Sequence, residues 1–154
     1  MFEDIEAEVA FENASEDPIS DLLAKTRDAR ITVNAEGIVV RNVVFGSDFA
    51  LGTCGVAVVA FRLAAIQKFE VLTVLATARP KPKVKLHKWV SDSVIGQRVM
   101  LHYQQTDDAV SATILQCDRH WLLVQPVNQA SQMIIAFGAL ARIEIGIVNN
   151  HSES

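Results

Sequence analysis

The spacing of apolar positions along the chain changes near residue 30, from a helical period to a strand period. Before this point, apolar residues recur every three or four positions after Asp17 and Pro18, a pair typical of a helix N-cap and first turn. This pattern predicts a short helix ending near Asp28, preceded by a more acidic helix over residues 1–13. The predicted buried face of the short helix consists of Ile19, Leu22, Leu23 and Thr26.

After residue 30, short runs rich in β-branched residues alternate with turns that contain Gly, Asn or Asp. Close spacing of such runs is typical of a small β-sandwich or barrel. We therefore predict a mainly β chain with two small β-barrels in tandem. The predicted segments are an acidic helical segment (1–29), a first barrel (30–76), a basic Pro/Lys linker (77–95), a second barrel (96–148) and a polar tail (149–154).

The two predicted barrels share an order of apolar runs that indicates an internal repeat. The matched runs are 30–33 with 98–101, 46–51 with 118–123, 58–61 with 134–137, and 63–66 with 140–143. A single barrel of this size buries too little surface to be stable alone, so two copies and the helices would share one fold. The exposed strand edges would then pair with each other, with the linker or with a second molecule.

The second copy holds three apolar runs in a fixed order. They are Asp118-x-x-Trp121-Leu122-Leu123, Ile134-Ile135-Ala136-Phe137 and Leu140-Ala141-x-Ile143. With these runs the chain resembles small uncharacterised actinobacterial proteins, in which an N-terminal helical part precedes an SH3-like or Sm-like β-barrel. The resemblance implies tandem SH3-like or Sm-like barrels after one or two N-terminal helices, and it implies no activity.

The two copies depart from the Sm pattern at the start of the last strand. Sm-family barrels carry an Ile/Leu-Arg-Gly signature there, which helps to form an RNA pocket. The corresponding stretches here are Arg142-Ile143-Glu144-Ile145-Gly146 and Ile66-Gln67-Lys68-Phe69-Glu70. Neither stretch matches, which argues against RNA binding of the Sm type.

Composition adds an apolar excess and a charge asymmetry. Half of the 154 residues are hydrophobic, which leaves material for an interface beyond the core. The longest apolar run, residues 56–66, is interrupted by Arg62 and is shorter than the roughly 20 residues that span a bilayer. The acidic start of the chain does not have the charge pattern of a signal peptide, so no membrane contact and a cytoplasmic location are expected. Residues 1–21 hold eight carboxylates and no Lys or Arg, while the rest has a formal net charge of +4.

The basic segment within the predicted linker is the first candidate partner-binding site. Its cations are Arg79, Lys81, Lys83, Lys85 and Lys88. On an extended chain stiffened by prolines they could follow a phosphate backbone. The alternatives are a solvated linker and a segment that neutralises the acidic N-terminal part.

Arg119 and Trp121, in the turn and strand at the centre of the second copy, are the second candidate. An exposed Trp121 would stack on a base or grip a peptide. Its place in an apolar strand instead favours a core position, as for its counterpart Phe49 and for Phe61 and Phe137.

Motifs of catalysis or metal binding are not evident in this sequence. The four histidines are scattered, and Cys54 and Cys117 are 63 positions apart, so two buried free thiols are favoured over a disulfide. We predict no enzyme, no cofactor, no metal site and no small-molecule substrate. The leading hypothesis is a non-enzymatic protein-interaction or assembly module that self-associates, and the alternative is a nucleic-acid-binding accessory or regulatory protein that uses residues 79–88.

Overall fold

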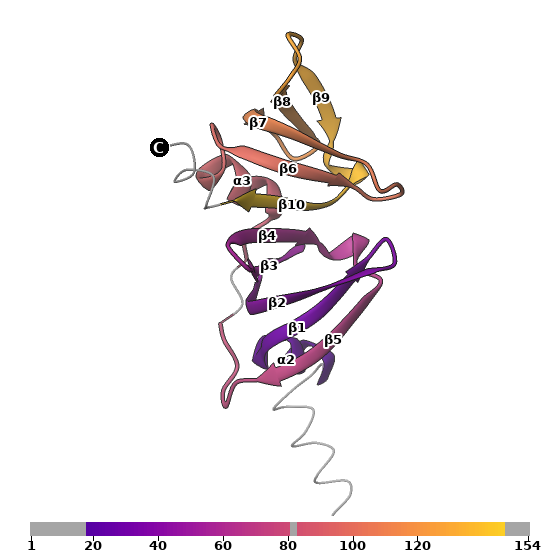
Figure 1. Cartoon of the computed structure of the whole chain (residues 1–154). Helices are drawn as coiled ribbons and strands as arrows, with labels where there is room; N and C mark the ends of the chain where they lie inside the picture. The colour runs from indigo at the N-terminus through magenta and orange to yellow at the C-terminus, as the bar shows by residue number, and fades with distance from the viewer. Residues whose placement is uncertain (1–17, 81–82, 147–154) are drawn as a thin grey trace, which may run out of the picture.

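The computed structural model of the chain describes residues 18–80 and 83–146 and shows a mainly β protein that begins with a short helix (Figure 1). The first half contains α2 (Pro18–Lys25), β1 (Thr26–Val33), β2 (Glu36–Phe45), β3 (Phe49–Cys54), β4 (Ala57–Arg62), the 3-10 turn η1 (Leu63–Ala65) and β5 (Lys68–Val74). The second half contains α3 (Leu86–Ser93), β6 (Arg98–Tyr103), β7 (Ala109–Cys117), β8 (Trp121–Pro126), β9 (Met133–Ala136), the 3-10 turn η2 (Phe137–Ala139) and β10 (Leu140–Gly146).

All ten strands belong to one antiparallel sheet, in the order β5-β1-β2-β3-β4-β10-β6-β7-β8-β9. The sheet is open, and its end strands, β5 and β9, lie at opposite ends of the molecule (Figure 1). Within the described residues, each half runs through the same sequence of a helix, four strands, a 3-10 turn and a fifth strand. The two halves meet where β4 pairs with β10, from Phe61 opposite Arg142 to Ala57 opposite Gly146.

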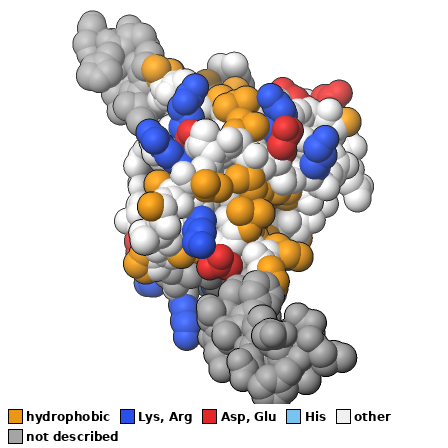
Figure 2. All heavy atoms as spheres, turned by 90° about the horizontal axis from the view of Figure 1, so that it is seen from below, with side chains coloured by type: hydrophobic (Ala, Val, Ile, Leu, Met, Phe, Trp, Pro, Cys, Tyr) orange, Lys and Arg blue, Asp and Glu red, His pale blue; other side chains and the backbone are white. Residues whose placement is uncertain are grey.

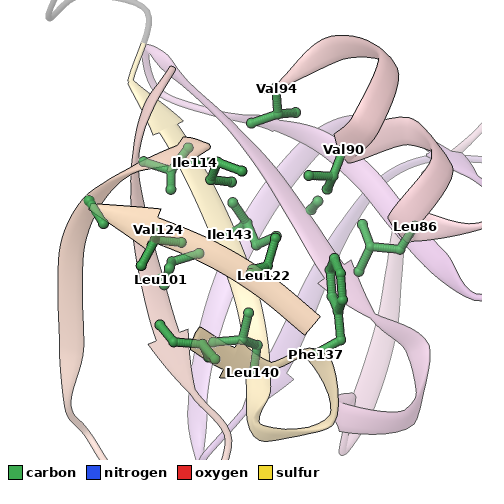
Figure 3. Close-up of a cluster of buried hydrophobic side chains, with 14 of the residues drawn as sticks. Leu86, Val90, Val94, Leu101, Ile114, Leu122, Val124, Phe137, Leu140 and Ile143 are labelled. Carbon is green, nitrogen blue, oxygen red and sulfur yellow. The ribbon is translucent and has the colours of Figure 1, made fainter. Parts of the chain in front are cut away.

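Two hydrophobic clusters form the core, and their boundary does not follow the middle of the chain. One cluster is centred on fully buried Ile31, Val40 and Phe61 of the first half and also includes Ala141 of β10. The other gathers α3 and the strands of the second half around Leu101, Ile114 and Leu122 (Figure 3). Phe49 and Ala60, from β3 and β4, also belong to this second cluster. The first half therefore contributes one face of β3 and β4 to each core.

The short helix is confirmed at its start but ends earlier than predicted. It begins at Pro18, ends at Lys25, and β1 follows at once from Thr26. Thr26 is buried as predicted and its Oγ1 donates to the Leu22 carbonyl at 2.9 Å, whereas Ile19 is 70% exposed and Leu22 46% exposed. The predicted buried face is therefore wrong at these two residues, because helical periodicity identifies an apolar stripe but not whether anything covers it. The predicted helix over residues 1–13 and the tail 149–154 lie outside the described residues.

The predicted basic linker 77–95 contains a helix. Helix α3 begins at Leu86, and Leu86, Val90 and Val94 are buried in the second cluster. The prolines at positions 80 and 82 come before Leu86 in the sequence, so neither interrupts this helix.

One of the four matched runs has the same turn geometry in both halves. Gly46 donates its backbone N–H to the Phe49 carbonyl at 2.9 Å, and Asp118 donates to the Trp121 carbonyl at 3.0 Å, so residues 46–51 and 118–123 occupy corresponding turns. Phe61 and Phe137 do not correspond, because Phe61 lies within β4 while Phe137 begins η2. A slip of two residues leaves every side chain on its face of a strand, so the apolar pattern could not detect this error.

Candidate functional site

The pairing of β4 with β10 continues the sheet from the first half of the chain into the second half. The backbone N–H of Leu63 donates to the carbonyl of Asp48 at 3.1 Å, which continues the β3–β4 ladder. Hydrogen-bonded pairs alternate along an antiparallel ladder, so the backbone groups of Ala60 point away from β3. The backbone groups of Ala60 therefore face Ile143 of β10, which lies opposite Ala60 in the register.

Helix α3 covers the outer face of β3 and β4 at this junction. The rings of Trp89 and Phe49 lie with their centroids 5.8 Å apart at an interplanar angle of 31°. Phe49 is 4% exposed and Ala60 is fully buried. Offset aromatic packing of this kind adds to the burial of apolar surface. Both the strand edge and the sheet face of the first half are therefore covered by the second half.

Backbone and side-chain hydrogen bonds hold the start of α3 against the turn that precedes β3. The Leu86 N–H donates to Asp48 Oδ1 at 2.7 Å, and the Ser47 N–H donates to the Val84 carbonyl at 2.8 Å. On the other side, Cys117 Sγ donates to the His87 carbonyl at 3.3 Å. Helix α3 is thus held between the turn before β3 and the end of β7.

Polar side chains of the first half also reach into the second half at the junction. Arg62 Nη1 donates to Gln104 Oε1 at 3.0 Å and to the carbonyls of Gly138 and Leu140 at 3.2 Å and 2.8 Å. Asn34, with a positive φ of 51°, donates through Nδ2 to the carbonyl of Tyr103 at 2.7 Å. These contacts tie the halves together independently of the strand ladder.

A cluster of charged side chains surrounds the buried Arg142 of β10 beside the same junction. Arg142 is 7% exposed, and its Nη1 and Nε lie 3.7 Å and 3.5 Å from carboxylate oxygens of Glu36 and Glu144. His102 Nε2 lies 2.9 Å from Glu144 Oε1. The hydrogen bond from His102 lowers the pKa of the Glu144 carboxyl, which Arg142 also favours in its charged form. Because these groups pair with one another, and the Arg142–Glu36 pair joins the two halves, we interpret the cluster as structural.

The outer edge of β9 is the counterpart of the β4 edge, but it carries no paired strand among the described residues. The N–H of Phe137 donates to the His120 carbonyl at 3.0 Å and so continues the β8–β9 ladder. By the same alternation, the backbone groups of Ile134 and Ala136 face outward. Strand β9 contains neither a charged residue nor a proline, the usual protections of an edge strand.

An exposed apolar face lies beside this edge. Trp121 is 51% exposed and Ile134 is 65% exposed, and both point away from the core side of β8 and β9. They contribute to a hollow of about 430 Å³, which is lined by Gln116, Cys117, Asp118, Trp121, Leu123 and Ile134. The prediction that Trp121 is a core residue is therefore wrong, whereas Phe49, Phe61 and Phe137 are buried as predicted.

Polar groups at the rim of the hollow shape its turn. Asp118 Oδ1 accepts from the backbone N–H groups of His120 at 2.8 Å and Trp121 at 2.9 Å, and these bonds lower the pKa of Asp118. Burial, followed by the nearby Asp118 charge, raises the pKa of the Cys117 thiol. Both cysteines are free as predicted, although each is partly rather than fully buried. This chemistry favours a stable turn with a neutral thiol.

The cations of the predicted basic site do not gather in one place. The Arg79 guanidinium donates to the Val43 carbonyl, and the Arg79 N–H donates to the Ala24 carbonyl. Lys83 and Lys85 are exposed, and Lys88 lies 3.4 Å from Asp92. Lys81 lies outside the described residues. The segment thus begins against α2 and β2 and ends at α3.

Arg119 is exposed in the turn before Trp121, with its Nε donating to His120 Nε2 at 3.2 Å. The contact between Cys117 and the His87 carbonyl places the beginning of α3 beside this turn. Arg79, at the other end of the segment, is held against the first half. Nucleic-acid binding by residues 79–88 stays a prediction.

Sequence reasoning missed Ile134 and the β9 edge as candidate interaction residues. The signal that could have found them is the run from Met133 to Phe137, which contains no charge, no proline and no polar side chain. An edge strand with such a run has no protection against pairing with a strand of another molecule.

Comparisons with protein-family models and with curated proteins find no match to this chain. Among the described residues, no helix has the length and apolar character needed to cross a membrane. The function is therefore argued from the geometry of the junction and of the open edges.

Proposed function

We propose that this protein is a non-enzymatic assembly module whose copies join head to tail, with β9 of one chain pairing with β5 of the next. In this proposal the two halves are copies of one small SH3-like or Sm-like barrel unit. The observation that carries it is the β4–β10 pairing, because there the fourth strand of one half pairs with the fifth strand of the other. Strands β9 and β5 are the remaining fourth and fifth strands, and both are edges of the sheet.

The two 3-10 turns supply the expected register between chains. Ala60 is the third residue before η1, and Ile134 is the third before η2. Phe69 is the fourth residue after η1, and Ile143 is the fourth after η2. Since Ala60 lies opposite Ile143, Ile134 is expected opposite Phe69 of the next chain.

The chemistry of the two edges supports pairing. Strand β9 has outward-facing backbone groups and no charged side chain. The charged residues of β5 are Lys68 and Glu70. Its Glu70 already accepts from Arg30 at 2.7 Å, and Leu72 and Val74 are 39% and 56% exposed. Two uncovered edges at opposite ends of one molecule favour a chain or ring of copies rather than a closed pair.

A proline in β9 tests the pairing. Ile134→Pro removes an outward N–H and leaves the inward groups that bond to β8 intact. Wild-type protein should show a mass above that of one chain by light scattering, rising with concentration, whereas Ile134→Pro should be a single chain with an unchanged circular dichroism spectrum. The matched control Ile134→Ala keeps the N–H and should still assemble, with weaker affinity. A wild-type protein that is monomeric at tens of micromolar contradicts the proposal.

A mixing experiment distinguishes head-to-tail pairing from pairing of two β9 edges. Val71, the sixth residue after η1, corresponds to Ile145, which lies opposite Val58 at the internal junction. Val71→Pro should therefore block β5 and leave β9 open. Head-to-tail pairing predicts that each proline variant is monomeric alone and that their mixture forms a two-chain species. Dimers of Val71→Pro alone would instead show that two β9 edges pair.

A further inference from the structure

We propose that the exposed Trp121 face of one chain is covered by α2 of the next chain, as α3 covers Phe49 within the chain. This inference rests on the proposed head-to-tail assembly and names the segment that completes its interface. The inference starts from two corresponding sites, of which one is buried and the other is exposed. Phe49 and Ala60 are 4% and 0% exposed, whereas Trp121 and Ile134 are 51% and 65% exposed.

The correspondence between these sites is geometric. Phe49 and Trp121 each close a turn through their carbonyl oxygen, at 2.9 Å from Gly46 N and 3.0 Å from Asp118 N. Leu51 lies opposite Ala60, and Leu123 lies opposite Ile134. The two faces therefore present the same arrangement of apolar side chains on two neighbouring strands.

The element that covers the first face is the helix preceding the next half. Helix α3 comes before β6, the neighbour of β10, and reaches over Phe49 because β10 pairs with β4. Helix α2 comes before β1, the neighbour of β5. If β5 pairs with β9 of another chain in the same way, α2 is carried over Trp121 of that chain.

Helix α2 has the surface this position needs. None of its residues is buried, and Ile19 and Leu22 are 70% and 46% exposed. Its other side, with Leu23 and Ala24, lines a hollow against Val43 and Phe45 of β2. The helix thus contacts its own half on one side and offers apolar side chains on another, as α3 does with Trp89.

The end of the molecule that holds α2 and β5 carries a broad apolar area. Figure 2 views this end and shows hydrophobic side chains gathered in a central group, with Lys, Arg, Asp and Glu side chains around it. An apolar centre with a charged rim is the usual composition of a protein–protein interface. Strands β8 and β9 lie at the opposite end of the molecule (Figure 1), and the hollow beside Trp121 includes the apolar side chains of Leu123 and Ile134 in its lining.

Fluorescence of Trp121 tests the docking separately from assembly. Trp89→Phe leaves Trp121 as the only tryptophan in the chain. When light scattering shows assembly, the emission of Trp121 should shift to shorter wavelength and acrylamide quenching should fall several-fold relative to the monomeric double variant Trp89→Phe/Ile134→Pro.

Leu22→Asp in the Trp89→Phe protein should weaken assembly at least several-fold and restore quenching. Ile19→Asp is the second variant if Leu22→Asp does not fold, and Val56→Asp, at a 60% exposed valine in the β3–β4 turn, is the matched control that should change neither.

The outcomes separate the two proposals. Assembly with Trp121 as accessible as in the monomer overturns the docking of α2 and leaves the edge pairing standing. Protection of Trp121 that Leu22→Asp and Ile19→Asp do not relieve shows that another segment covers the face, which also overturns the docking. Absence of assembly overturns both proposals.

Discussion

Two faces of this molecule have the same design and opposite surroundings. On β3 and β4, Phe49 lies under Trp89 and the strand edge is paired. On β8 and β9, Trp121 is half exposed and the edge is open. The difference teaches that strand geometry alone does not decide which sheet face is core. What decides it is the presence of a covering element: α3 covers the first face, whereas the described residues contain no helix over the second.

The largest expected effect separates these faces by stability. Phe49→Ala should lower the free energy of unfolding by about 3 to 5 kcal/mol, because it leaves a cavity under α3. Trp121→Ala should cost less than about 1 kcal/mol in dilute, monomeric protein, since its side chain packs on little there. Urea unfolding at low and high protein concentration measures both. A large cost for Trp121→Ala in the monomer would contradict the comparison.

The next effect concerns the polar contacts that only the covered junction has. Arg62→Met keeps much of the side-chain length and removes the hydrogen bonds to the Gly138 and Leu140 carbonyls. We expect a loss of about 1 to 3 kcal/mol, because the bonds to a charged group are lost and carbonyl groups at the junction lose a partner. Lys83→Met, at an exposed cation before α3, is the control and should be neutral. Equal stability of the two variants would show that Arg62 does not hold the halves together.

A smaller effect is expected at Asn34. Asn34→Gly allows the positive φ of 51° and removes the bonds from Nδ2 to the carbonyls of Tyr103 and Thr106. The expected cost is about 1 kcal/mol. Thermal unfolding measures this cost. The control for the change in backbone entropy is Asn42→Gly, at another positive φ, because the Asn42 side chain makes no hydrogen bond to the described residues of this junction.

The smallest effect is a pH dependence at the junction. The hydrogen bond from His102 lowers the pKa of Glu144 below its ordinary value of 4.5, so the stabilisation is present above the pKa of the unfolded chain. It is lost as pH falls through the lower pKa of the folded chain. His102→Phe should raise the pKa of Glu144 in an NMR titration and move the acid loss of stability to higher pH. The pKa of Asp28, lowered mainly by Thr73, should stay unchanged as an internal reference.

The sequence was sufficient for the strands and for much of the core. Runs rich in β-branched residues between Gly, Asn and Asp turns predicted most of the strands, and the match between the two copies predicted the burial of Phe49, Phe61 and Phe137. The apolar character of its strand also placed Trp121 in the core, but an apolar strand has two faces and its sequence does not say which of them is covered. The same limit applies to Ile19 and Leu22 on α2.

The register between the halves was harder to predict than the strands themselves. A strand pattern repeats every two residues, so a match slipped by two still aligns apolar with apolar. The 3-10 turns η1 and η2, from which we infer the proposed correspondence between the halves, have no distinct signature in the sequence. The β4–β10 pairing joins residues about 80 positions apart in the chain, so a local sequence pattern does not predict it.

Hydrogen exchange at single backbone amides tests the head-to-tail pairing most directly. The amides of Ile134 and Ala136 face outward from β9, while the amide of Ile135 faces β8 and serves as the internal reference. As concentration rises and chains assemble, exchange at Ile134 and Ala136 should slow strongly relative to Ile135. Exchange at these two amides that is equally fast at low and high concentration would contradict pairing through β9.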